Sequence, residues 1–535
     1  TFADGADIIT ASAGTSNFRA GVNAGNSIES GGNYNVVVGD EAGTAITTGE
    51  RNSTLGSHTL YVNTTGDRNV AVGQASMISN TTGSSNTAVG RDTLGSNTTA
   101  SNNTAIGQQA LFVNTTGTEN VALGVSALAA NTTASNNVAV GAFTLDANTT
   151  GTANTGLGHA VLSTNVTGSS NTGVGFTSLL VNTASNNTAV GFKSLYANTT
   201  GASNTAVGYN AGTAITTGGY NVAVGRQALM TTTTVNDNVA VGNNALRLNT
   251  TGASNTAIGS SALDANTTAS NNTAVGKSAL AANTTGDRNV AVGTEALDAN
   301  TTSDGNTAVG YRALTTNTTA EINTAIGFQT LALNTTGTAN TALGSNSLYA
   351  NTTASYNTAV GSNALLANTT GTQNTTLGAS ALDANTTGSY NTAVGVSALG
   401  TNVLGSRNTA IGRDALFAVN PASAADMYNV GVGFGAGAAV TTGIHNTLIG
   451  AFAGDTITTG TGNICIGTGA DTATSGRVYS ITMGRDVTSV GDYYFTFGVD
   501  STTNRVYNNF TSNATWTRAS DERIKKDIST NTDCG

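Results

Sequence analysis

The chain has 535 residues, of which 67 are glycine and only 9% are charged, whereas ordinary globular domains carry roughly 25% charged residues. Its net charge is −10 and its 19 basic residues are scattered, which excludes the clustered basic face of a nucleic-acid-binding protein. Glycine does not recur at every third position, which excludes collagen, and no apolar run approaches the roughly 18 residues of a membrane span.

Residues 1–16 come before any repeat, and we expect them to form an N-terminal cap or attachment segment. From there a motif of the type Asn-Thr-Ala-Val-Gly recurs 28 times, most often at intervals of 17 residues. Its glycine, here called the repeat glycine, runs from Gly21 to Gly484. Four residues before it stands an asparagine, the strand asparagine, in every repeat from Asn17 to Asn463. Such regularity indicates a tandem-repeat architecture over residues 17–484.

A 17-residue unit is too short for a helical hairpin repeat, whose units run about 33 to 47 residues. The motif is rich in β-branched residues and ends at glycine, which is typical of a short strand. The sequence therefore predicts an all-β fold, a parallel β-solenoid (β-roll) of about 28 coils. We expect each coil to contain two short strands joined by turns.

A second apolar position, here called the core leucine, lies four residues after the repeat glycine. In four of the coils after the first, this leucine is replaced by glycine, and an apolar residue appears three places later instead. These replacements are Gly43 with Ile46, Gly212 with Ile215, Gly437 with Val440 and Gly454 with Ile457. A thin core that tolerates neither a void nor an overfilled layer explains the exchange. We also expect the small alanine of each motif to let a neighbouring chain approach closely, in a homo-oligomer.

Stacked coils would bring successive strand asparagines into line, where their amides can bond along the axis as in cross-β stacks. The sequence thus predicts a structural ladder rather than a ligand site. Its members include Asn69, Asn86, Asn103, Asn120 and Asn137.

The motif variants at residues 69–73 and 103–107 resemble the repeat of trimeric autotransporter adhesin heads. The resemblance covers residues 17–484, although the period here is longer than is usual in those heads. It implies a left-handed parallel β-roll and a homotrimer.

Residues 485–519 break the period and gather aromatic residues, which predicts a β junction that closes the solenoid. Residues 520–535 resemble the start of the C-terminal intramolecular chaperone of phage tail fibres and tailspikes. The matching residues are Ser520, Asp521, Arg523, Ile524 and Lys525.

This second resemblance implies trimerisation followed by self-cleavage between Ala519 and Ser520. Ser520 would be the nucleophile and Lys525 its base. Only the start of such a chaperone is expected here, since 15 residues follow Ser520. The alternative interpretation of the segment is a charged helical start without activity.

Other candidate sites have simpler structural explanations. The Asn-Thr-Thr turns are N-glycosylation sequons, for example at Asn63, Asn80, Asn97 and Asn114, but the motif is also common turn chemistry. Regular threonines would suit an ice-binding surface, yet here they belong to turns. The three histidines are too far apart in coil number to form a metal site.

A polysaccharide depolymerase would need paired carboxylates. Four aspartates share one coil position, but we expect them to lie on a solvated face without an apolar pocket. They are Asp146, Asp264, Asp298 and Asp383.

Together these patterns predict a non-enzymatic structural fibre of a phage or similar virus, extracellular on the virion, that serves host attachment. Expected partners are two further copies, a host cell-surface receptor or glycan, and a baseplate or another fibre protein, with no cofactor, metal, nucleic acid or membrane span. The alternative function is a bacterial cell-surface adhesin or a glycosylated extracellular filament subunit.

Overall fold

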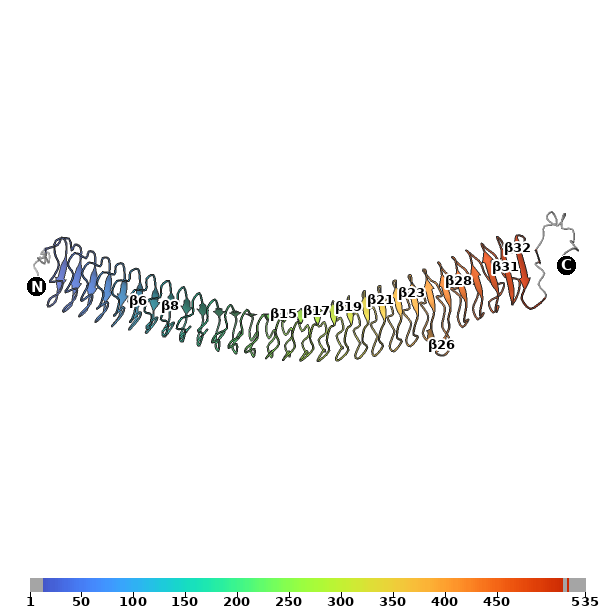
Figure 1. Cartoon of the computed structure of the whole chain (residues 1–535), viewed down its shortest axis with the longest axis horizontal. Coiled ribbons are helices and arrows are strands. Elements are labelled where there is room, and N and C mark those ends of the chain that lie inside the picture. Colours follow the sequence, from blue (N-terminus) through green and yellow to red (C-terminus); the bar gives the residue numbers. More distant parts are fainter. Residues whose placement is uncertain (1–12, 513–516, 519–535) are drawn as a thin grey trace, which may run out of the picture. The chain divides into compact units, whose positions relative to one another are not determined.

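The computed structural model describes residues 13–512 and 517–518. The chain divides into two compact units, with the boundary between Asn271 and Asn272. Each unit is a parallel β-solenoid, and together they contain about 28 turns with a spacing of roughly 17 residues (Figure 1). No helix occurs within the described ranges. The predicted all-β solenoid is therefore confirmed.

The N-terminal unit stacks three-residue strands in chain order, each pairing in parallel with the next. Residues one repeat apart lie opposite each other, as Thr87 lies opposite Thr104. Its strands are β1 (Phe18–Ala20), β2 (Val36–Val38), β3 (Ser53–Leu55), β4 (Val70–Val72), β5 (Thr87–Val89), β6 (Thr104–Ile106), β7 (Val121–Leu123), β8 (Val138–Val140), β9 (Thr155–Leu157), β10 (Thr172–Val174), β11 (Thr188–Val190), β12 (Thr205–Val207), β13 (Val222–Val224), β14 (Val239–Val241) and β15 (Thr256–Ile258).

The C-terminal unit repeats this arrangement and adds a small two-stranded sheet, β24 with β26, beside the one long repeat that contains Pro421. Its strands are β16 (Thr273–Val275), β17 (Val290–Val292), β18 (Thr307–Val309), β19 (Thr324–Ile326), β20 (Thr341–Leu343), β21 (Thr358–Val360), β22 (Thr375–Leu377), β23 (Thr392–Val394), β24 (Gly405–Ser406), β25 (Thr409–Ile411), β26 (Ala425–Asp426), β27 (Val430–Val432), β28 (Thr447–Ile449), β29 (Ile464–Ile466), β30 (Ile481–Gly484), β31 (Tyr494–Gly498), β32 (Arg505–Asn509) and β33 (Thr517–Arg518).

In most coils the motif strand is the only strand, so the prediction of two strands per coil is wrong. The segment after the repeat glycine still bonds to its neighbours along the stack, as the Leu94 N–H does to the Ala110 carbonyl at 3.0 Å. However, it has left-handed backbone at alternate residues, with φ of 57° at Asp92 and 49° at Leu94. A strand needs extended backbone throughout, and these reversals curl the segment into turns instead.

The strand alanine points inward, and the residues on either side of it point outward. Ala88 is fully buried, whereas Thr87 and Val89 are only partly covered. Because successive strand residues face opposite sides, the sequence alternation alone fits a strand with alanine inward or with alanine outward. Since alanine is buried, the expectation that alanine forms the outer contact surface is wrong. The residue just before the repeat glycine, here called the outer valine, faces outward instead.

The core leucine supplies the large inward side chain of each coil, and Leu60 is fully buried although its φ is 47°. Where glycine replaces it, the compensating residue fills the same space. A Cβ atom added to Gly43 would stand 2.7 Å from Ile46 Cδ1, and Ile46 is fully buried. The predicted exchange of one large residue for another in the core is confirmed.

The repeat glycine is required for two reasons, as Gly107 illustrates. Its φ is 133°, which side chains other than hydrogen rarely allow. A Cβ atom there would also collide with the carbonyl oxygen of Gly124 in the next coil. Each coil therefore packs its backbone directly on that of the next at this corner.

The solenoid ends in an antiparallel hairpin. Strand β31 still pairs in parallel with β30, but β32 turns back and pairs antiparallel with β31. The connecting loop is held by Asp500, whose carboxylate accepts the backbone N–H groups of Thr502, Thr503 and Asn504 at 2.8–3.0 Å. The hairpin thus occupies the edge that β31 would otherwise leave open to another chain.

Candidate functional site

The strand asparagines form the expected ladder inside each unit. The backbone N–H of Asn120 donates to Asn103 Oδ1 at 3.0 Å, and the Asn103 Nδ2 donates to the Gly117 carbonyl at 2.9 Å. The same pattern holds along the five residues named for the ladder, all fully buried. These side chains join the strand of one coil to the turn of the next, which is a structural role.

A second ladder runs along the asparagine of each Asn-Thr-Thr turn, here called the turn asparagine. Asn80 Nδ2 donates to Asn63 Oδ1 at 2.8 Å and to the Gly83 carbonyl at 2.9 Å. Asn97 and Asn114 continue the series. The sequence identified these residues only as turn formers or sequons, because nothing in the local pattern says which way the amide points.

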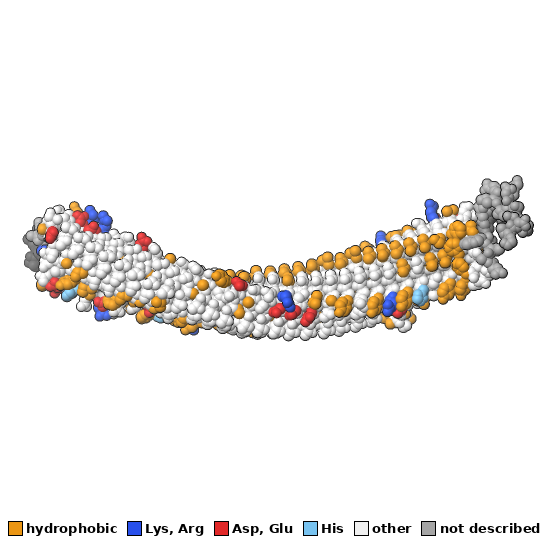
Figure 2. Space-filling model, viewed as in Figure 1, with side chains coloured by type: hydrophobic (Ala, Val, Ile, Leu, Met, Phe, Trp, Pro, Cys, Tyr) orange, Lys and Arg blue, Asp and Glu red, His pale blue; other side chains and the backbone are white. Residues whose placement is uncertain are grey.

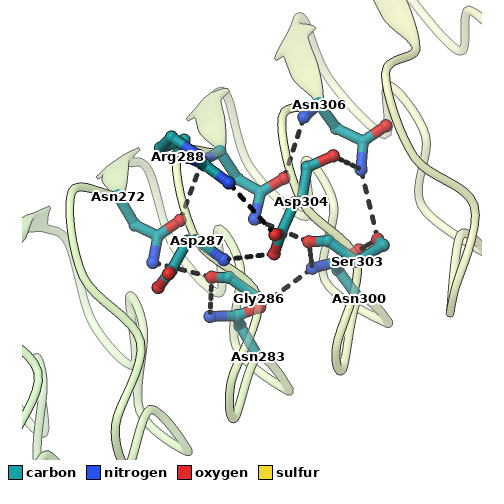
Figure 3. A network of polar contacts seen from close by, with 10 residues as sticks. Asn272, Asn283, Gly286, Asp287, Arg288, Asn300, Ser303, Asp304 and Asn306 are labelled. Carbon is teal, nitrogen blue, oxygen red and sulfur yellow. Dashed lines mark hydrogen bonds and ion pairs between the residues drawn. The ribbon is translucent and has the colours of Figure 1, made fainter.

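The two ladders meet at one carbonyl group, as Figure 3 shows for the C-terminal unit. The Gly286 oxygen accepts Asn272 Nδ2 at 2.9 Å and Asn283 Nδ2 at 3.0 Å. Beside it, the Asp287 N–H donates to Asp304 Oδ1 at 2.7 Å. In other coils a serine hydroxyl or another aspartate accepts the equivalent N–H, so a third column of bonds runs along the stack.

The turn asparagines have no room for a sugar in the folded coil. Asn63, Asn80, Asn97 and Asn114 are fully buried, and their Nδ2 atoms are already engaged with carbonyl oxygens. A glycan bonded to such a nitrogen would displace both the ladder bond and the packing around it. The geometry therefore argues against a glycan on every coil.

The outer valines form an apolar column on the outside of each unit. Among its more exposed members the exposed fraction runs from 36% at Val207 to 54% at Leu55 in the N-terminal unit, and from 37% at Met483 to 52% at Leu377 in the other. Figure 2 shows this column in the C-terminal unit as a continuous row of hydrophobic side chains along the strands. Parallel sheets are normally covered on both faces, so this exposure is unusual.

An apolar depression of about 630 Å³ lies on the outer side of the last strands of the C-terminal unit. It is lined by Met483, Gly484, Phe495, Phe497, Gly498 and Val499. Met483 and Phe497 are the residues that end the outer-valine column. The depression therefore continues the column, and widens it with aromatic side chains at the place where the sequence predicts a junction.

Aromatic side chains stack along the surface in columns of their own. In the N-terminal unit, His159, Phe176, Phe192 and Tyr209 stack with ring centroids 5.3–5.7 Å apart. In the C-terminal unit, the Arg407 guanidinium lies 4.7 Å from the Tyr390 ring centroid. These columns are not apparent from neighbouring residues in the sequence, because the stacked rings are separated by an entire repeat. Their common position in the repeat is the signal that identifies them.

The four aspartates that share a coil position make different contacts. Asp146 Oδ1 accepts Ser163 Oγ at 2.6 Å, and Asp264 holds Arg247 in a two-point ion pair with contacts of 2.8 and 3.2 Å. All four are half-buried, and partial burial raises the pKa of Asp298 and of Asp383. Within either unit, they do not form the carboxylate pair of a glycosidase.

The most perturbed carboxyl group is Asp471, near the C-terminal end of the solenoid. Burial raises its pKa to about 7, although it accepts the N–H groups of Thr472 at 2.7 Å and Thr456 at 3.1 Å. Asp455 lies against it and raises the pKa further. Burial also raises the pKa of the nearby Cys465 thiol, which keeps it protonated.

Ser520, Lys525 and the Ala519–Ser520 bond lie outside the described residues. Within the described ranges, no group of three or more His, Cys, Asp or Glu side chains is placed to hold a metal ion. The same part of the chain has no helix that is long and apolar enough to cross a membrane. In comparisons with known proteins, no family model matches this chain, and no curated sequence matches it.

Proposed function

We propose that this protein is the subunit of a homotrimeric structural fibre, a phage or virus tail fibre that carries receptor contacts to a host surface. The observation that carries the proposal is the apolar column of outer valines. Soluble monomers rarely expose contiguous apolar patches larger than a few hundred Å². Every repeat from the second onward places Val, Ile, Leu or Met there, so the column is a built surface that a further copy would cover.

The number of copies comes from the resemblance to trimeric β-rolls and to the chaperone of trimeric fibres. The described coils add support for a mechanical role. Many of their polar side chains form hydrogen bonds between coils. Within either unit, the four equivalent aspartates do not form a carboxylate pair of the kind that a glycosidase needs. Uniform coils of this kind provide length and rigidity.

Native mass spectrometry beside the denatured chain mass tests the assembly. The expected native mass is that of three chains. Replacing outer residues by charge, in Leu123→Asp with Leu157→Asp, should reduce the trimer fraction, because buried charges would face one another. Val166→Asp is the matched control, since Val166 is 41% exposed but lies outside the column. A wild-type protein that stays single-chain would contradict the proposal.

The second part of the proposal, which rests on resemblance alone, is self-cleavage of a longer precursor between Ala519 and Ser520. A precursor extended beyond residue 535 should release its C-terminal part, and Ser520→Ala and Lys525→Met should both remain uncut. A precursor that stays intact in wild-type form would remove this step and leave the fibre unaffected.

A further inference from the structure

A second depression, of about 350 Å³, lies on the C-terminal unit away from the strand segments. It is lined by Gln329, Asn346, Tyr349, Ala350, Leu366 and Ala367. All six residues follow the repeat glycines of three successive coils, and none belongs to a strand. Its volume is within the range of about 300–1,000 Å³ that is usual for ligand sites.

The walls of the depression are two large side chains on successive coils. Tyr349 and Leu366 each follow a core leucine, and the equivalent residue of the preceding coil is the small Ala332. Ala350 and Ala367 line the space beside these walls. The backbone beneath is fixed, because the Ala350 N–H donates to the Leu366 carbonyl at 3.0 Å and the Leu333 N–H to the Tyr349 carbonyl at 3.2 Å.

Two carboxamides supply the polar part of the lining. The Gln329 N–H donates to the Tyr311 carbonyl and the Asn346 N–H to the Phe328 carbonyl, each at 2.9 Å, so both residues are held by the stack. The Asn346 side chain makes only a long contact of 3.5 Å with Asn363 Oδ1. The Gln329 side chain bonds to no protein group among the described residues. Donors and acceptors are therefore available on one side of the depression.

We propose that this depression binds one neutral hexopyranose ring of a surface glycan. A pyranose has an apolar C–H face, which suits Tyr349 and Leu366, and hydroxyl groups at its edge. Each carboxamide offers both a donor and an acceptor, the combination that neighbouring hydroxyls require. The lining contains no charged residue, which favours a neutral sugar over an acidic one.

This inference rests on the proposed function, since it specifies the receptor that such a fibre would contact. No lining residue belongs to a strand, so the proposed sugar site and the outer-valine column share no residue. The sugar site and the assembly surface are thus separate, and they can fail separately.

Ligand-observed saturation-transfer NMR on the full chain tests the site. The probes are methyl β-D-glucopyranoside, methyl β-D-galactopyranoside and methyl α-D-mannopyranoside, with methyl β-D-glucuronide as the charged comparator. We expect transfer to at least one neutral probe and weaker transfer to the glucuronide. Tyr349→Ala should weaken binding by about tenfold or more, and Gln329→Ala should weaken it less.

Tyr196→Ala is the matched control, because Tyr196 has the same place in a coil of the N-terminal unit, directly after Leu195. It should leave binding unchanged. No transfer to any of the neutral probes, or transfer that persists in Tyr349→Ala, would overturn the inference. A trimer that binds no sugar would refute this site alone, whereas a monomer that binds sugar would refute the proposed assembly alone.

Discussion

Thr144 of one coil fills the space that an alanine methyl would need at Gly156 of the next strand. The Cγ2 atom of Thr144 lies 2.5 Å from where that Cβ atom would stand. Val161 stands in the same relation to Gly173, with its Cγ1 atom in the way. In most other coils the strand residue is alanine and its partner is alanine or serine, although Thr93 stands opposite Ala105. Volume is therefore exchanged between the two chain segments in some layers only.

Gly156→Ala should therefore destabilise the N-terminal unit by about 1–3 kcal/mol, because the added methyl overpacks a filled layer. Thr144→Ser removes the obstructing methyl and keeps the hydroxyl, as in the coil that pairs Ser178 with Ala189. The double variant should recover most of the loss in thermal unfolding. Equal midpoints for the single and double variants would show that these two residues do not compete for space.

Ile46→Asn should lower stability by about 2–5 kcal/mol, since it empties the space that a core leucine fills in other coils. Gly43→Leu alone should also destabilise, because its Cβ atom would stand 2.7 Å from Ile46 Cδ1. Combined, the two changes recreate the common coil, and urea unfolding should show partial recovery. Additive losses in the double variant would contradict the exchange.

Asn103→Ala should cost about 1–3 kcal/mol, because it leaves the buried Asn120 N–H without its acceptor and removes one of the two donors to the Gly117 carbonyl. Asn102→Ser is the control, as Asn102 is exposed and Ser85 adopts the same left-handed backbone one coil earlier. It should change stability by less than about 0.5 kcal/mol. Amide hydrogen exchange at Asn120 would locate the loss, and unchanged protection there would argue against the ladder.

Raising the pH should destabilise the C-terminal coils. The folded-state pKa of Asp471 is raised to about 7, so the folded state holds a proton that the unfolded chain releases near the ordinary aspartate pKa of 3.8. Stability should thus decrease as pH rises from about 4 to 7, by a few kcal/mol at most, and stay level above. Asp471→Asn should flatten most of this slope in thermal unfolding, while Asp298 and Asp383 retain a smaller slope of the same sign. A stability that rises over this window would contradict the buried, protonated carboxyl.

Acid should act separately on the C-terminal hairpin. Three backbone N–H groups hold the pKa of Asp500 well below its usual range, so its contribution is present above about pH 4 and lost under stronger acid. Asp500→Asn removes the same negative charge at neutral pH, so it should loosen the loop as acid does in the wild-type protein. The measurement is the rate of proteolysis between residues 499 and 505 in the wild-type protein and in Asp500→Asn at neutral pH. Equal rates would contradict the stabilising role of Asp500.

The sequence predicted the period, the solenoid and the strand-asparagine ladder, because identical residues at a fixed interval must stack once the coils do. It did not determine which way a three-residue strand faces. Ala88 and Val89 face opposite sides whichever way the strand is turned. Only packing against the core leucine decides that the smaller residue, Ala88, faces inward. The left-handed backbone of Leu60 was equally hidden, since leucine carries no local preference for it.

Relations across a whole repeat were the least visible. Phe176 stacks on Phe192, and Thr144 occupies the space beside Gly156. Both relations join residues of different coils, which a local sequence pattern cannot connect. The depression beside Tyr349 likewise needs residues from three coils. Comparing equivalent positions of successive repeats, rather than neighbours in sequence, would have found the aromatic columns.

The strand-asparagine ladder also has a direction. In every rung the N–H belongs to the later coil and the accepting side-chain oxygen to the earlier one, as with Asn52 and Asn35 or Asn137 and Asn120. A coil emerging during synthesis therefore meets an acceptor that is already fixed, and its own oxygen waits for the coil that follows. We expect coils to be added to the stack in order from its N-terminal end.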